Sequence, residues 1–203
     1  MKKNNIILSS IFVVLFSLSS FSQGGGVWNF DWNMGFGMGE TADFISAPSF
    51  RGFTVDGRGF VTDNLTVGGI VGWNTFYESD GFVTIDFGTY ATHATVHGYS
   101  RKYINALPIM INSHYYFAQT TIMPYAGVGV GTMYVEERNF MGIYYTEEKA
   151  WHFAVAPELG IIFPFGSSNS GINANVKYNY AAKTRDTKST SFLSFNIGIS
   201  YIF

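Results

Sequence analysis

The sequence predicts an all-β protein, an eight-stranded antiparallel up-and-down transmembrane β-barrel with short periplasmic turns and longer extracellular loops. The clearest observation is the period of two in residues 27–39, which is typical of a strand because successive side chains point to opposite faces of a sheet. One face carries Trp28, Phe30, Trp32, Met34, Phe36 and Met38, and the other carries Asn29, Asp31, Asn33, Gly35, Gly37 and Gly39. Further strands of this kind follow, and the connections between them alternate between short and long.

The bulky face is predicted to point outward, against lipid. An eight-stranded barrel has an interior that side chains only just fill, so two or three large side chains from every strand cannot all point inward. Glycine and asparagine can. Charged residues make up 13% of the chain, too few to coat a soluble surface of this size. A soluble lipocalin-type barrel with the bulky face inside is the alternative that this argument opposes.

The first half of the chain continues the pattern. Residues 41–50 lose the alternation and contain Pro48, which indicates a loop. Residues 51–61 and 65–77 alternate again and are joined by a tight Asp/Asn-type turn at residues 62–64. Residues 78–98, rich in Gly, Thr, Asp and His, form the longest connection, although residues 82–87 alternate well enough for the strands to extend into it. The next strand covers about residues 99–117, and Pro108 predicts a bulge or local break in it.

The second half completes the count of eight. Residues 118–121 turn the chain into a strand at residues 123–135, with Tyr125 among the inward side chains, and the charged residues 136–149 are predicted to be a loop. Residues 150–165 form the sixth strand, and the Gly- and Ser-rich residues 166–171 form a turn. Residues 172–180 and 190–203 form the last two strands around a polar loop at residues 182–189. Closure is expected because an unpaired strand edge in lipid leaves backbone groups without partners, at several kcal/mol each.

The N-terminus has the three regions of a secretory signal peptide. Lys2 and Lys3 precede an apolar run at residues 6–18, and small residues at Ser20 and Ser22 place cleavage before Gln23. The run is shorter than the ~20 residues that a spanning helix needs. The predicted domains are therefore a signal peptide at residues 1–22 and a barrel at residues 23–203.

Composition narrows the function classes. The formal net charge of −2 gives no electrostatic reason to expect a nucleic-acid partner. With no cysteine, the chain has no disulfide framework, thiol chemistry or lipoprotein acylation site.

Several segments resemble one known group of proteins. They are the leader, the alternating strands, residues 107–109 (Leu-Pro-Ile), residues 124–129 (Pro-Tyr-Ala-Gly-Val-Gly) and residues 199–203 (Ile-Ser-Tyr-Ile-Phe). Together they are similar to the small eight-stranded outer-membrane β-barrels of the OmpX and OmpA type, with a likeness to those of Bacteroidetes bacteria. The resemblance implies a cell outer membrane location, contact with lipid and lipopolysaccharide, and a terminal signal, Tyr201 and Phe203, that the barrel assembly machinery reads. No OmpA-like peptidoglycan-binding domain follows Phe203 in this sequence, so tethering to the cell wall is not expected.

A polar network inside the barrel is the candidate site. Five charged residues fall on inward positions: Asp31, Asp56, Arg58, Glu158 and Lys177. If the turn at residues 166–171 is centred between Ser167 and Ser168, Glu158 lies directly across from Lys177. We expect these charges to neutralise one another and fill the lumen, because an unpaired buried charge is costly. The alternative is an ion or proton path, or a gate.

Two further groups of residues were considered as a metal site and as a catalytic site. His93 and His97 lie in the longest loop, but their spacing does not bring them together outside a helix, so no metal site is predicted. The adjacent Ser113 and His114 point to opposite faces of a strand, and no catalytic triad emerges. His114 and His152 are expected to be interior hydrogen-bonding residues. No catalytic residue and no cofactor is predicted.

The sequence therefore favours a structural or surface-interaction protein. Its loops at residues 41–50, 78–98, 136–149 and 182–189 carry aromatic side chains that could contact an extracellular protein or glycan. The alternatives are a narrow channel or gated pore and a lipid A-modifying barrel enzyme.

Overall fold

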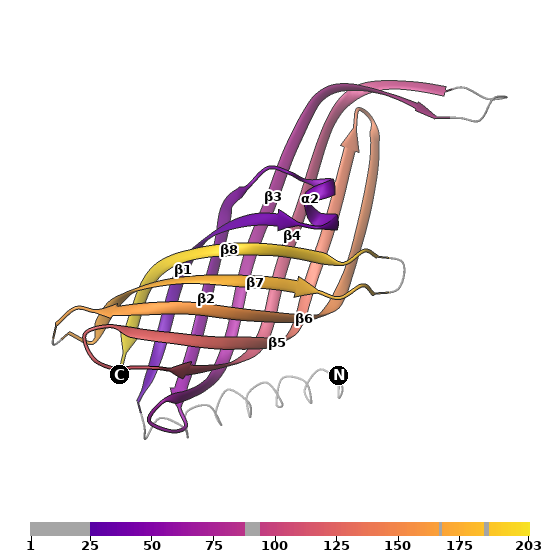
Figure 1. The fold of residues 1–203 in the computed structure, drawn as a ribbon. Helices are drawn as coiled ribbons and strands as arrows, with labels where there is room; N and C mark the ends of the chain where they lie inside the picture. Colours follow the sequence, from indigo (N-terminus) through magenta and orange to yellow (C-terminus); the bar gives the residue numbers. More distant parts are fainter. Residues whose placement is uncertain (1–24, 88–93, 167, 185–186) are drawn as a thin grey trace, which may run out of the picture.

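The computed structural model is a closed β-barrel and describes residues 25–87, 94–166, 168–184 and 187–203 (Figure 1). Eight antiparallel strands follow one another around the barrel in chain order, and β1 pairs with β8 to close it. The strands are β1 (Gly26–Met38), β2 (Ser49–Phe60), β3 (Leu65–Phe87), β4 (Ala94–Tyr116), β5 (Met123–Met141), β6 (Tyr144–Pro164), β7 (Ser170–Ala181) and β8 (Thr190–Ile202). The predicted fold class is confirmed. The predicted signal peptide, residues 1–22, lies outside the described residues.

The two faces of the sheet are chemically different, as the alternation predicts. Phe53, Ile111 and Phe153 point outward and are each more than half exposed. The inward face is lined by buried asparagine, serine and threonine side chains and by glycine. Apolar residues therefore cover the exterior, and polar residues the middle of the interior, which is the reverse of a soluble barrel.

Glycines on the inward face leave room for the few large side chains that share it. A Cβ atom at Gly160 would overlap the Tyr125 ring, and one at Gly127 would overlap the His114 ring. Tyr125 and Gly160 are direct cross-strand partners, as are His114 and Gly127. The narrow lumen therefore depends on pairing a ring with a residue that has no side chain.

Two hairpins are longer than predicted. β3 and β4 continue through most of residues 78–98, and β5 and β6 pair as far as Met141 and Tyr144. The prediction of a loop at residues 136–149 is wrong. Charged residues pair there across the strands, Glu136 with Lys149 and Arg138 with Glu147. Figure 1 shows both hairpins rising beyond the other strands.

The remaining differences are local. The predicted loop at residues 41–50 contains a short helix, α2 (Glu40–Phe44), and β2 begins within it at Ser49. Of the two outcomes predicted at Pro108, the structure has the local break and not the bulge: pairing between β3 and β4 lapses beside it and resumes at Ala106 in the same register. The bulge lies instead between Ser79 and Gly81, where Gly81 has a φ of +73°. Within the described residues, no helix is long and apolar enough to cross a membrane.

Candidate functional site

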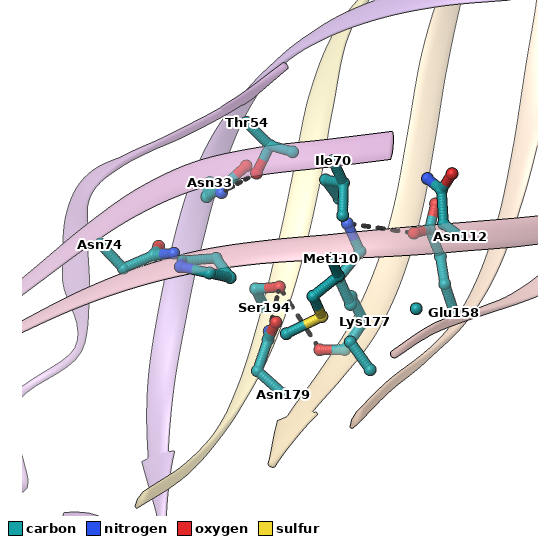
Figure 2. A pocket seen from close by; sticks show the side chains of 13 residues that line it. Asn33, Thr54, Ile70, Asn74, Met110, Asn112, Glu158, Lys177, Asn179 and Ser194 are labelled. Atoms are coloured by element: carbon teal, nitrogen blue, oxygen red, sulfur yellow. Dashed lines mark hydrogen bonds and ion pairs between the residues drawn. The ribbon is translucent and has the colours of Figure 1, made fainter. Parts of the chain in front are cut away.

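The five charged residues predicted to face the lumen all do so, and each is at most 6% exposed. They come from four strands: β1 supplies Asp31, β2 supplies Asp56 and Arg58, β6 supplies Glu158 and β7 supplies Lys177. The strand register sets Glu158 directly opposite Lys177. Figure 2 shows this pair beside Asn112, Asn179 and Ser194, which line the same part of the lumen.

Glu158 has three charged or polar partners. The Lys177 Nζ lies 3.0 Å from Glu158 Oε2, and the His114 Nε2 lies 3.6 Å from the same oxygen. The Tyr125 hydroxyl donates a hydrogen bond of 2.8 Å to Glu158 Oε1. Both carboxylate oxygens are therefore engaged away from water, as a buried charge requires.

Asp31 is held by amides rather than by a cation. The Asn173 side-chain amide donates to both carboxylate oxygens at 3.0 Å, and the Asn175 amide donates to Oδ2 at 3.2 Å. The Asn173 Oδ1 atom lies 2.9 Å from the Tyr125 hydroxyl. Asp31 is thereby connected to Glu158 through one asparagine and one tyrosine.

Asp56 and Arg58 form the third part of the network. The Asn112 and Asn29 amides donate to Asp56 at 2.8 and 3.2 Å, and the Arg58 Nη2 lies 3.5 Å from Asp56 Oδ2. The Arg58 guanidinium also lies over the Tyr125 ring, 4.7 Å from its centroid. Tyr125 therefore links all three parts.

The sequence analysis predicted that Tyr125 points inward but did not include it in the polar network. Its neighbours in the chain are alternate inward glycines, and its cross-strand partner is also a glycine. A lone large polar ring in a row of inward glycines is the signal that could have identified it. Its position between residues from distant strands could not be read from the sequence.

The space between these side chains is too small for a solute. The cavity beside Glu158 and Lys177 has a volume of only about 10 Å³. That is the room needed for about one water. Figure 2 shows Met110 and Ile70 reaching into the same space.

Apolar side chains close the lumen on both sides of the polar network. Towards the long hairpins, Phe76 and Phe192 meet edge to face at 5.3 Å within a buried cluster that includes Ile45 beside α2. Towards the short turns, Tyr116 packs in a second buried cluster with Val27. The barrel is therefore filled along its length.

The histidine and serine residues considered as metal ligands or catalytic residues do not form a site among the described residues. His93 lies outside the described residues, and exposed His97 stacks on Phe82 and bonds the Thr84 hydroxyl. Among the described residues, no group of three His, Cys, Asp or Glu side chains is placed to hold a metal ion. His114 is buried in the lumen, whereas the neighbouring Ser113 hydroxyl donates to the Thr66 carbonyl oxygen.

Comparison with solved structures shows which known proteins share this fold. No protein-family model matches the chain, and no curated protein matches it. Neisserial surface protein A is similar in structure, with a TM-score of 0.57 and 13% identity over 88% of this chain and 97% of that chain. The chain has the fold of a small outer-membrane barrel.

Two other solved structures of outer-membrane proteins resemble this barrel more distantly. Ail of Yersinia pestis, in complex with the heparin analogue sucrose octasulfate, has a TM-score of 0.49 and 13% identity over 88% of this chain and 97% of that chain. Outer membrane protein W of E. coli has a TM-score of 0.45 and 18% identity over 89% of this chain and 98% of that chain.

Proposed function

We propose that this protein is a non-enzymatic outer-membrane barrel that anchors an interaction surface on the outside of the cell. The observation that carries the proposal is the filled lumen, in which a buried network of charged and polar side chains lies between two apolar clusters. Such an interior stabilises the barrel but offers no route through it. The apolar exterior and the outer-membrane-barrel fold support the location. The signal peptide, with cleavage before Gln23, and the reading of Tyr201 and Phe203 by the barrel assembly machinery remain part of this proposal.

The surface that we assign to this function is the sheet formed by the upper parts of β3, β4, β5 and β6. β2 pairs with β3 only as far as Asn74, and β7 pairs with β6 only from Ala154. Within the described residues, β3 beyond Gly81 and residues 144–151 of β6 have a strand neighbour on one side only. Open strand edges can pair with an extended segment of another protein. At the tip between β5 and β6, Ile143 is 94% exposed.

A binding experiment tests this assignment. The chain, displayed on cells that lack it, is probed with arrays of secreted proteins and glycans. A matched variant replaces residues 80–100 with a two-residue Asn-Gly turn. We expect a ligand bound by the full-length chain to be lost on shortening, while heat-modifiable gel migration shows an intact barrel. Binding that survives the shortening, or no binding to any member of the arrays, would contradict the proposal.

The alternative of a narrow channel makes a different prediction. The filled lumen predicts no stable single-channel openings in planar bilayers, because ions would have to displace the Glu158–Lys177 pair and the Phe76–Phe192 cluster. Reproducible conductance from the purified, folded chain, with a mock purification as the control, would favour the channel instead.

The alternative of a lipid A-modifying enzyme lacks a suitable constellation in the described residues. Ser113 and His114 face opposite sides of β4, and His114 is enclosed among lumen side chains. Unaltered lipid A in cells that express the chain is the expected result, and an added or removed acyl chain would overturn it.

A further inference from the structure

A hydrogen-bonded polar belt crosses the outer face of β3, β4 and β5. The Trp73 indole N–H donates to the Thr75 hydroxyl at 2.8 Å, and this hydroxyl donates to Asn105 Oδ1 at 2.9 Å. The Asn105 amide donates to Glu136 at 3.1 Å. On the side of the short turns, the outward positions next to the belt carry apolar residues such as Val71 and Ile109. The belt therefore marks the level at which the hydrocarbon of the membrane ends.

A continuous row of aromatic side chains lies next to the belt, on the side of the long hairpins. Tyr77 and Tyr103 have ring centroids 4.8 Å apart, and Tyr103 and Phe140 are 5.9 Å apart. Phe140 and Tyr145 continue the row at 4.8 Å. Aromatic side chains with a polar tip are typical of the boundary between lipid and water.

Cationic side chains outnumber acidic ones on this face. At the level of the aromatic row and the belt, the outward positions carry Arg51, Arg101, Arg138 and Lys149 against Glu136 and Glu147. The next outward carboxylate position, Asp86, lies farther towards the end of β3. Arg138 pairs with Glu136 at 2.6 Å, and Lys149 pairs with Glu147 at 2.8 Å. These two pairs leave Arg51 and Arg101 as the excess.

Arg51 and Arg101 share one environment. Each is exposed, and neither has a carboxylate within 4.0 Å among the described residues. Arg51 lies over the Tyr77 ring at 5.8 Å, and Arg101 lies over the Tyr99 ring at 5.3 Å. An aromatic ring holds each guanidinium at the surface while its N–H groups stay free to bind an anion.

We infer that Arg51 and Arg101, with Tyr77 and Tyr103 between them, bind the phosphate groups of a glycolipid in the outer leaflet. The inference rests on the proposed location in the outer membrane. A planar guanidinium matches a phosphate with two parallel hydrogen bonds, and anionic lipid attracts cationic side chains at the membrane surface. Lipid is the occupant because the face continues directly from the belt that ends the hydrocarbon layer. On β4, Arg101 is four residues from Asn105, about 14 Å along the strand.

The test reconstitutes the full chain in neutral phosphatidylcholine vesicles. One set of vesicles contains a small fraction of bisphosphorylated lipid A, and the other contains the same lipid with its phosphates removed. Bound lipid is counted by native mass spectrometry. We expect the chain to prefer the phosphorylated form by about tenfold, and Arg51→Gln/Arg101→Gln to lose this preference. The matched control, Lys183→Gln/Lys188→Gln, removes the same charge from the exposed loop between β7 and β8 and should retain it.

The outcomes separate the two proposals. A chain that does not insert into either kind of vesicle, judged by heat-modifiable migration, contradicts the outer-membrane proposal itself. Insertion without preference for the phosphorylated lipid, or an equal loss in both double variants, contradicts only the phosphate site.

Discussion

Replacing Lys177 by methionine is expected to destabilise the folded barrel by about 3–5 kcal/mol, because it leaves a buried charge without its partner. Glu158 would lose the ammonium group 3.0 Å from its carboxylate. Asp31 and Asp56 share the same lumen, so the remaining positive charge of Arg58 would face three carboxylates. The free energy of unfolding is measured by urea titration in detergent micelles, followed by tryptophan fluorescence.

A double variant separates the charge from the packing. Glu158→Gln/Lys177→Met removes both charges and keeps a hydrogen-bonding group beside Tyr125, so it should cost less than the sum of the two single variants. Lys183→Met, at an exposed position, is the control and should change stability by no more than about 0.5 kcal/mol. A Lys177→Met barrel as stable as this control would show that the pair is dispensable.

The sequence predicted the membrane-spanning part of the fold well because lipid imposes a strict chemical rule there. Each outward residue must be apolar, whereas the narrow lumen demands small or polar residues, so the alternation in residues such as 27–39 is nearly complete. The same rule predicted which side chains enter the lumen. The position of Glu158 opposite Lys177 was predicted from the centre of the turn at residues 166–171.

This alternation is required only where the strands cross the hydrocarbon layer. Strands outside the membrane have water on one or both faces, so charged residues such as Arg138 and Glu147 can pair across them. Their charged sequence lacks the apolar alternation, and it was therefore predicted to be a loop. The bulge before Gly81 also shifts the register by one residue, which hides the pattern of the upper part of β3.

Contacts across the lumen could not be predicted from the sequence, for a different reason. Asp31 and Asn173 are separated by 142 residues, and only closure of the barrel brings them together. The meeting of Phe76 and Phe192 likewise depends on how far each strand rises. The pattern predicts a face for each residue, but the height of that residue in the barrel depends on register and tilt.

The orientation of the two faces has a direct experimental test in Ile111→Arg. This side chain is 70% exposed and lies on the outward face of β4, midway between the belt at Asn105 and the short turn. On a soluble protein, such a substitution would cost little. On a lipid-facing strand near the middle of the bilayer, arginine should cost about 2–4 kcal/mol.

The matched control carries the same substitution at an equally exposed apolar residue outside the membrane. Phe82 is 73% exposed and lies beyond the polar belt on the upper part of β3, so Phe82→Arg should change stability by no more than about 0.5 kcal/mol. Both variants are refolded into vesicles, and their free energies of unfolding are compared by urea titration. Solvent exposure alone predicts equal effects, because the two side chains are equally uncovered. A large cost at Ile111 with none at Phe82 is expected only if hydrocarbon surrounds the lower part of the barrel and water surrounds the upper part.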